Sequence, residues 1–377
     1  MSARAPRVAI VSDPLVQRGG AERVVEAIAA VYPDAPIYAL LYSPSLGPAS
    51  LADRIVPSWL NGIPGAAARH RLLIPFYPAA VESFDLAAYD VVVSSHHTAA
   101  KGILRNSDMT HVCYCHTPMR AIWERPHEEL QNLPALLRPV ASAAMRRFRL
   151  WDAMTALRVD RFIANGLTTQ RRIADHYGRE STILNPPIDT KRFTPGGAAG
   201  DYYLVASRLV PYKRIDIAVA ATALVGRRLI VAGTGPCAAR LRAPHVEQRG
   251  HVSDAELVTL MRGARALIYP QYEDFGMTPL EAMACGRPVV AYARGGAVET
   301  VIDGVTGVLA PEQTPEAFAR AIARLERSRF EPERLRRRAE QFSYEHFSSA
   351  LRSIIDETHQ NRSRMYGSSA PAVRALY

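Results

Sequence analysis

Two glutamates with seven residues between them, Glu273 and Glu281, form the chemically most suggestive pattern in this sequence. An apolar run at 266–270 precedes them and predicts a buried strand, and the helical pattern that follows ends at Gly286. Glu273 is therefore expected on a loop at the carboxyl end of a strand, and Glu281 in the first turn of a helix. Carboxylates at such positions can accept hydrogen bonds from the hydroxyl groups of a sugar.

The start of the same predicted helix offers unpaired backbone N–H groups and the positive end of the helix dipole, which together bind anionic oxygens. The amides in question belong to Gly276, Met277 and Thr278, and Pro279 is well placed in the first helical turn. Hydroxyl-binding carboxylates beside anion-binding amides match the groups that a nucleotide sugar presents.

Two cations, Arg208 and Lys213, follow a predicted strand at 202–206 and precede a predicted helix. A guanidinium can bind a diphosphate through two parallel hydrogen bonds, and an ammonium adds a point charge, so the pair can neutralise a diphosphate without a metal. A solvated basic loop is the usual explanation for a single Arg or Lys. We favour the binding interpretation because both cations lie in the same half of the chain as the two glutamates.

Two glycine-rich turns also follow predicted strands. Gly233, Gly235 and Ala238 match the G-x-G-x-x-A pattern of dinucleotide sites. No acidic residue stands cleanly at the end of the next strand to bind an adenosine ribose, so we favour a tight turn beside the nucleotide over an NAD site. Gly19 and Gly20 permit close approach of a ligand to the backbone at a helix start, and a simple strand-to-helix turn explains them equally well.

His116 ends a predicted strand just before Pro118, a position from which it can bind a substrate hydroxyl or transfer a proton. A packed core histidine is the ordinary alternative. A metal site is a further alternative, because three more histidines and two cysteines lie nearby in the sequence. We disfavour a metal because Cys113 and Cys115 are separated by one residue, which is not a zinc-binding spacing.

Two stretches of the first half, 69–77 and 145–151, combine arginines with apolar and aromatic residues, as segments at a membrane interface do. For the second stretch, an amphipathic helix with one solvent-exposed face and one face buried in the core is at least as good an explanation. The candidate residues for contact with the acceptor or membrane are Arg69, Arg71, Arg147 and Arg149.

Short apolar strands alternate with amphipathic helices, and this pattern occurs twice, which predicts two α/β domains with parallel sheets. A segment rich in Pro and Gly at 185–197 is the candidate linker. Predicted strands are 8–12, 37–41, 90–95, 111–115, 161–165, 202–206, 228–232, 246–250, 266–270, 288–291 and 307–309. Predicted helices are 21–31, 141–157, 168–177, 214–225, a helix from 236, 254–262, 298–303, 314–327, 333–341 and 344–360, with an irregular tail after it.

A length of 377 residues agrees with two domains, and 48% hydrophobic residues with 22% charged residues is typical of a globular chain. No apolar run reaches the length of a membrane span, and the first strand comes too early for a signal peptide, so we expect a cytoplasmic protein with four reduced cysteines. The net charge of +10 suits phosphorylated ligands or anionic lipids. A nucleic-acid binder rests on this charge alone, and we rank it low.

Together these motifs resemble the GT-B glycosyltransferases, and more narrowly the retaining glycosyltransferase family 4 (GT4). The glutamate pair, the Ser-Arg-Leu segment with its lysine, the Gly-Gly-Ala-Glu loop and the Cys-His-Thr-Pro loop occur in the family's order over nearly the whole chain. The chain is similar to bacterial GDP-mannose-dependent mannosyltransferases of polysaccharide and O-antigen assembly, with Tyr89, Asp90 and Trp123 among the residues that support this subgroup.

The resemblance implies an α/β, GT-B fold in which two Rossmann-like doubly wound domains face each other across a cleft. Residues 1–185 would bind the acceptor, and 186–343 would bind the nucleotide-sugar donor. The C-terminal helix, 344–377, would return to the first domain.

The resemblance also implies a role for each candidate residue. Arg208 and Lys213 would bind the diphosphate, Glu281 the ribose and Glu273 the sugar hydroxyls. Amides from Phe275 to Thr278 would lie along the sugar and phosphate, the loop containing His251 and Val252 would flank the base, Gly20 would approach the phosphate and His116 the sugar.

The implied reaction is the transfer of a hexose, with retained anomeric configuration, to a hydroxyl of a lipid-linked saccharide in polysaccharide or lipopolysaccharide synthesis. Mannose from GDP-mannose is the first expectation, a UDP-sugar such as UDP-glucose or UDP-GlcNAc is an alternative, and an NAD-dependent oxidoreductase is a weaker one. We expect no metal or cofactor, because no Asp-x-Asp signature occurs, and we expect peripheral contact with the inner face of an anionic membrane.

Overall fold

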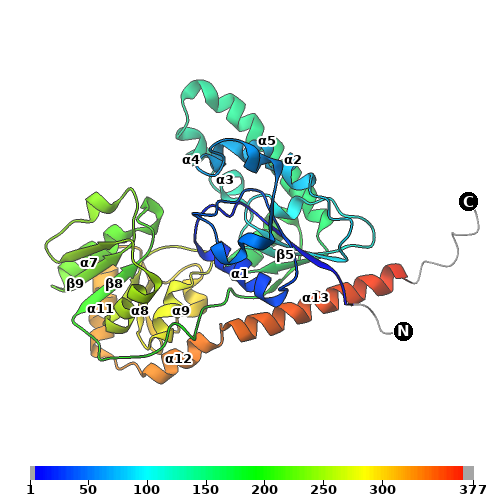
Figure 1. Cartoon of the computed structure of the whole chain (residues 1–377). Helices are drawn as coiled ribbons and strands as arrows, with labels where there is room; N and C mark the ends of the chain where they lie inside the picture. Colours follow the sequence, from blue (N-terminus) through cyan, green and yellow to red (C-terminus); the bar gives the residue numbers. More distant parts are fainter. Residues whose placement is uncertain (1–4, 368–377) are drawn as a thin grey trace, which may run out of the picture. The chain divides into compact units, whose positions relative to one another are not determined.

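The computed structural model describes residues 5–367, which form two compact units. The first unit contains residues 5–184 and 348–367, and the second contains residues 185–347. Each unit is built around one parallel sheet with helices on its faces (Figure 1). Parallel strands need crossover connections, and the βα alternation of the sequence supplies them.

The first unit contains a seven-stranded sheet in which every neighbouring pair of strands is parallel. In spatial order the strands are β3 (Ile55–Pro57), β2 (Ile37–Ala39), β1 (Val8–Ser12), β4 (Val91–His96), β5 (Thr110–Cys115), β6 (Arg161–Ala164) and β7 (Ser181–Ile183). The helices of this unit are α1 (Gly20–Val31), α2 (Tyr77–Glu82), α3 (Arg120–Trp123), α4 (Pro126–Gln131), α5 (Arg138–Thr155) and α6 (Leu167–Tyr177), joined by the second part of α13 (Tyr344–Gly367).

The second unit contains a six-stranded parallel sheet. In spatial order the strands are β10 (Val246–Gly250), β9 (Arg228–Ala232), β8 (Tyr202–Ala206), β11 (Ala266–Tyr269), β12 (Val289–Tyr292) and β13 (Gly307–Ala310). Its helices are α7 (Ile215–Leu224), α8 (Asp254–Gly263), α9 (Thr278–Ala284), α10 (Ala297–Thr300), α11 (Pro315–Arg327) and α12 (Pro332–Glu340).

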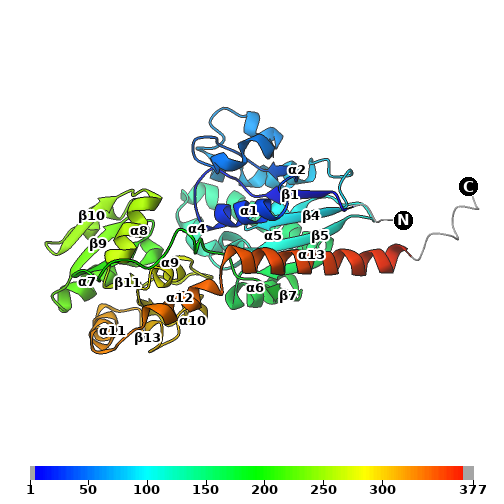
Figure 2. The ribbon, with the colours of Figure 1, turned by 60° about the horizontal axis from the view of Figure 1, so that its bottom comes forward.

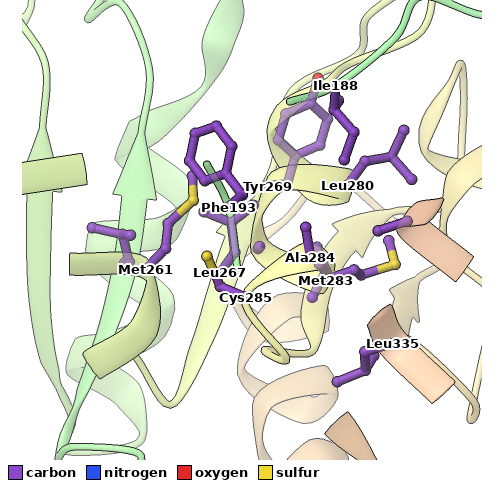
Figure 3. Packing of buried hydrophobic residues seen from close by; sticks show 14 of the residues in the cluster. Ile188, Phe193, Met261, Leu267, Tyr269, Leu280, Met283, Ala284, Cys285 and Leu335 are labelled. Atoms are coloured by element: carbon purple, nitrogen blue, oxygen red, sulfur yellow. The ribbon is translucent and has the colours of Figure 1, made fainter. Parts of the chain in front are cut away.

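The core of the second unit holds α9 firmly in place. Every residue of this helix after Thr278 is buried. Leu280 and Met283 of α9 lie in one apolar cluster with Leu267 of β11 and Leu335 of α12 (Figure 3). The loop before α9, which carries Glu273, therefore joins two elements that are fixed by the same core.

In both sheets the strand order reverses beside the first strand, between β1 and β4 in the first unit and between β8 and β11 in the second. Ligands of doubly wound sheets bind outside the carboxyl ends of the strands at this reversal. The loops after β8 and β11 contain Arg208, Lys213 and Glu273, so the topology places the three candidate residues at the expected edge.

Some elements differ from the sequence prediction. The helix expected from residue 236 is only a 3₁₀ turn, η8 (Ala238–Leu241), and Pro244 follows too soon for a longer helix. Strands β3 and β7 were not predicted because each has only three residues, too few to show a strand pattern. The tail expected to be irregular continues α13 as far as Gly367; residues 368–377 of the predicted 344–377 helix lie outside the described residues.

Helix α13 begins in the second unit, and from Ser348 onward it belongs to the first. Arg352 donates to the carbonyl of Val31 at 3.0 Å, and His359 Nδ1 lies 2.9 Å from Thr110 Oγ1. Further along, Arg362 Nη1 is paired with Asp160 at 2.5 Å. Polar contacts thus fix α13 along the first unit (Figure 2).

Candidate functional site

Lys213 and Glu273 meet at the carboxyl edge of the second sheet, although they are sixty positions apart in the sequence. The Lys213 ammonium contacts Oε1 of Glu273, with the two side chains 10% and 25% exposed. The hydroxyl of Tyr269, the last residue of β11, donates to the other oxygen, Oε2. Glu273 is therefore held by a cation on one oxygen and by a hydroxyl on the other, while still reaching solvent.

The turn that presents Lys213 has an unusual backbone. Lys213 ends the short 3₁₀ turn η7 (Pro211–Lys213), and the next residue, Arg214, joins this turn to α7. Arg214 has a φ of 51° and is the single non-glycine residue with positive φ among residues 5–367. Such a conformation costs about 1–3 kcal/mol and commonly occurs beside functional residues. Arg214 itself pairs with Asp216 at the surface.

Arg208 lies close to this pair and is exposed. Its Nη2 atom donates to the hydroxyl of Tyr212 at 3.2 Å, and the Lys213 ammonium lies 5.5 Å from the centre of the same ring. Tyr212 thus contacts both cations and holds them at one place. Two positive charges at the edge of a sheet form a favourable site for a diphosphate.

The glycines of the dinucleotide-like motif support the Arg208 loop. Gly233 and Gly235 have φ values of 143° and 156°, and a Cβ atom on either would overlap the carbonyl oxygen of Ser207 or Leu209. The Leu209 amide also donates to the carbonyl of Thr234 at 2.8 Å. These glycines are needed because two backbones come into direct contact, and this contact positions the loop that carries Arg208.

A second glycine pair, which sequence reasoning missed, supports the Glu273 loop in the same way. The Gly296 amide donates to the carbonyl of Glu273 at 2.9 Å. A Cβ atom on Gly295 would overlap that carbonyl, and one on Gly296 would overlap the backbone of Phe275. The available signal was a Gly-Gly pair that follows strand β12 after two intervening residues. Tyr269 was missed as well, although it ends a strand that was predicted.

The remaining candidates of the second unit lie on loops and helix starts at the same edge. Gly276 has a φ of 85°, and a Cβ atom there would overlap the Tyr269 hydroxyl. Met277 is the N-cap of α9 and Thr278 its first residue, while Glu281 is buried in the first turn. His251 is exposed and Val252 partly buried after β10, just before the capping box that starts α8.

In the first unit, His116 follows β5 and contacts the end of the neighbouring strand β4. Its Nε2 atom lies 2.9 Å from Ser95 Oγ. Burial lowers the pKa of His116 to about 3, with His97 adding to the effect, so the imidazole is neutral at pH 7. A neutral imidazole can exchange hydrogen bonds with a hydroxyl group but does not supply positive charge.

Gly19 and Gly20 form the N-cap and first residue of α1. A Cβ atom on Gly19 would lie 2.9 Å from Oε2 of Glu22, which is buried in the first helical turn. Gly19 therefore makes room for a buried carboxylate. This packing role is separate from the expectation that a ligand approaches this turn, which stays a prediction.

The histidines and cysteines discussed above as metal ligands do not converge. His111 Nε2 lies 2.8 Å from Ser94 Oγ, and its Nδ1 lies 3.0 Å from the carbonyl of Arg158. Cys113 and Cys115 are both in the core. Within residues 5–367 there is no group of three or more His, Cys, Asp or Glu side chains arranged to bind a metal ion.

An ion pair is completely buried in the first unit, beside α5. The Lys101 ammonium donates to Asp152 Oδ1 at 2.6 Å and to Thr155 Oγ1 at 2.8 Å. The other carboxylate oxygen accepts hydrogen bonds from Trp123 Nε1 at 2.7 Å and the Tyr177 hydroxyl at 2.9 Å. The Lys101 and Asp152 side chains are fully inaccessible to solvent, so this pair ties helices to the sheet and is not part of a binding site.

The four arginines proposed for acceptor or membrane contact fall into two groups. Arg69, Arg71 and Arg147 are exposed. Arg149 is partly buried, donates to the carbonyl of Ile122 at 2.9 Å and lies 5.8 Å from the ring centre of Trp123. The guanidinium of Arg149 is thus engaged in internal packing, and contact of the four arginines with an acceptor or membrane stays a prediction. Within the described part of the chain, no helix is both long and apolar enough to span a bilayer.

Two family models match successive parts of the chain: "Glycosyltransferase Family 4" over residues 18–192, and "Glycosyl transferases group 1" over residues 191–342. Curated relatives include D-inositol 3-phosphate glycosyltransferases. The chain is 34% identical to that of Geodermatophilus obscurus over 230 residues, which is 51% of each chain. It is 33% identical to that of Mycobacterium tuberculosis over 248 residues, 55% of this chain and 52% of the relative. The match thus spans about half the length of these relatives.

Solved structures resemble the whole chain. Anabaena HepE in complex with UDP has a TM-score of 0.68 at 19% identity, with coverage of 93% of this chain and 100% of that one. Sucrose-phosphate synthase from Thermosynechococcus elongatus has a TM-score of 0.69 at 18% identity, with coverage of 94% and 100%. At these identities the likeness establishes the fold alone.

Proposed function

The chain belongs to the glycosyltransferases of GT-B fold, with a family 4 segment followed by a group 1 segment, and from this premise we propose that it transfers a hexose from a nucleoside-diphosphate sugar to a hydroxyl group. The observation that carries the proposal is the contact of Lys213 with Glu273, beside Arg208, at the carboxyl edge of the second sheet. Cations for a diphosphate and a carboxylate for sugar hydroxyls lie there within one small site.

The proposed roles follow from this geometry and from the family resemblance. Arg208 and Lys213 bind the donor diphosphate, Glu273 the sugar hydroxyls and Glu281 the ribose. His116 binds a hydroxyl group, because its imidazole is neutral. The first unit holds the acceptor.

The proposed reaction retains the anomeric configuration by a same-face route. The bond between the anomeric carbon and the phosphate oxygen breaks while the acceptor oxygen bonds to that carbon from the same side. The leaving phosphate accepts the acceptor's proton. Arg208 and Lys213 stabilise the negative charge that grows on the diphosphate, so the proposal requires no metal or other cofactor.

For the donor we propose GDP-mannose, on the resemblance of the Tyr-Cys-His-Thr-Pro loop to mannosyltransferases. A UDP-sugar is the second candidate, favoured by the solved relatives that bind UDP and UDP-glucose. The proposed acceptor is a lipid-linked saccharide of cell-surface polysaccharide synthesis. The enzyme would then work in the cytoplasm, in peripheral contact with the inner face of the membrane.

Nucleoside diphosphates are expected to raise the melting temperature of the purified protein. A ligand present at 100 times its Kd stabilises the folded state by about 2.7 kcal/mol. GDP, UDP, ADP and NAD, each with and without EDTA, are compared by thermal melting. Stabilisation by GDP that EDTA leaves unchanged supports a metal-independent GDP-mannose site. Stabilisation by UDP instead supports the same transfer reaction with a UDP-sugar as the donor. A response to NAD alone, or to none of the four, contradicts the proposal.

Tyr269→Phe is expected to lower kcat about tenfold. The tyrosine hydroxyl is bonded to Oε2 of Glu273, and hydrogen bonds to charged groups contribute about 1.5–3 kcal/mol. Tyr269 acts through Glu273, so kcat should fall while the KM of the acceptor stays unchanged.

A matched control for this variant exists in the neighbouring strand. Tyr203 of β8 also donates to a glutamate, Glu326, at 3.0 Å. Tyr203→Phe removes the same type of bond away from the site and should leave kcat as in the wild type. Equal losses of kcat in both variants would show that Tyr269 has only a structural role.

A further inference from the structure

Helix α5 of the first unit presents an apolar stripe to solvent. Its apolar residues are spaced by four, ten, four and three residues, which keeps them on one side of the helix, from the 3₁₀ turn η5 (Ala135–Leu137) to just beyond α5. They are between 62% and 88% exposed. The residues of this stripe are Leu136, Val140, Leu150, Met154 and Leu157. An outward apolar row of this length is unusual on a globular protein, where large apolar patches mark interaction sites.

The opposite face of α5 is fixed to the unit, so the stripe cannot turn inward. Phe148, Asp152 and Thr155 are buried on that face. The Asp152 carboxylate is bonded to Lys101, Trp123 and Tyr177 as described above. The helix therefore keeps its apolar row outside, and Figure 1 shows α4 and the first half of α5 standing out from the first unit.

The exposed charged residues of α5 itself are all arginines, while the nearest exposed carboxylates in the chain, Glu128 and Glu129, lie on α4. Residues 132–151 contain four arginines and no aspartate or glutamate. Arg146 and Arg147 are exposed, and Arg147 falls on the stripe between Val140 and Leu150. Arginine can keep its guanidinium in the polar layer of a bilayer while its carbon chain lies along apolar neighbours.

We propose that α5 is a membrane-docking helix that lies in the interface of an anionic lipid bilayer, with its stripe among the acyl chains and Arg146 and Arg147 at the headgroups. An apolar face bordered by arginines is the pattern of helices that lie in a membrane interface. Arg146 and Arg147 complement the negative charge of an anionic lipid surface, and this complementarity favours a membrane over a protein partner. The inference names the docking surface for the proposed membrane contact, and it does not depend on which donor or acceptor is used.

Flotation of the full chain with lipid vesicles tests the docking helix. Wild type is expected to float with vesicles of phosphatidylcholine mixed with phosphatidylglycerol, and to be released by salt. Leu150→Glu with Met154→Glu places two charges in the stripe and should abolish flotation. Arg146→Ala with Arg147→Ala should weaken binding about 30-fold, since each arginine near an anionic surface changes affinity about fivefold.

Leu224→Glu is the matched control, because Leu224 is a 61% exposed leucine at the end of α7 in the second unit. It should float like wild type. Circular dichroism and thermal stabilisation by nucleoside diphosphates check that every variant is folded and binds donor normally. If the wild type did not bind nucleoside diphosphates, the proposed function would be contradicted, but the inference that α5 docks on a membrane would not be affected.

Three outcomes would overturn the docking helix. The first is a wild type that remains in solution with anionic vesicles, and the second is a Leu150→Glu, Met154→Glu variant that floats as well as wild type. In the third, the wild type self-associates in sedimentation and this variant is monomeric, while neither floats; the stripe would then be an interface between two copies of the chain.

Discussion

Replacing Lys213 by alanine is expected to lower kcat by about 100- to 1,000-fold. A single group that stabilises a developing anion contributes about 2.7–4 kcal/mol to the transition state. Lys213 is also the cation that contacts Glu273, so its loss leaves that carboxylate free to repel the diphosphate. The lost stabilisation and the added repulsion both raise the barrier for breaking the bond between the anomeric carbon and the phosphate oxygen. The measurement is steady-state transfer with the donor identified by thermal melting.

Lys191→Ala serves as the control for this variant. Lys191 is also a lysine of the second unit that is paired with a glutamate, Glu345, at 2.7 Å, but its side chain is 84% exposed. Its removal should leave kcat unchanged. If Lys213→Ala turned over donor and acceptor like the wild type, the assignment of this site would be wrong.

Replacing Lys101 by alanine is expected to destabilise the first unit by about 3–5 kcal/mol. Removing one partner of a buried pair leaves an uncompensated charge in the interior. Asp152 would keep its bonds to Trp123 and Tyr177 but lose its only cation within bonding distance among the described residues.

Tryptophan fluorescence during urea unfolding measures this loss in the first unit alone. The chain has three tryptophans, Trp59, Trp123 and Trp151, and all of them lie in that unit. The control is an exposed pair of the same unit, Arg7 with Asp90 at 3.6 Å. Arg7→Ala should cost less than about 1 kcal/mol. An equally small change for Lys101→Ala would contradict the prediction that this buried pair stabilises the first unit.

The sequence predicted the regular elements near the site well, because those elements carry local signals. The strands at 8–12, 202–206, 228–232 and 246–250 match β1, β8, β9 and β10. Each is a short run bounded by turn residues, and its length and those flanking residues, rather than periodicity, mark it as a strand. Arg208, Lys213 and Glu273 follow strands of one sheet, so the order of the chain was enough to place them on the same edge.

Contacts between distant loops could not be predicted in this way. The glycine motif at Gly233 was visible, but its packing on the Ser207 carbonyl depends on how two loops meet in space. Lys101 and Asp152 are fifty-one residues apart, and neither stands in a local pattern that suggests burial. Arg149 was grouped with exposed arginines because its sequence neighbours are basic, and only the fold brings its guanidinium to the Ile122 carbonyl.

The path of α13 has a consequence for the order of events on the ribosome. Its residues from Ser348 onward complete the first unit, through contacts such as His359 with Thr110 and Arg362 with Asp160. Nascent domains usually fold in the order of their synthesis. Here the first unit cannot complete its fold until the entire second unit has been translated. The surface that α13 will cover therefore stays accessible to chaperones until that helix leaves the exit tunnel.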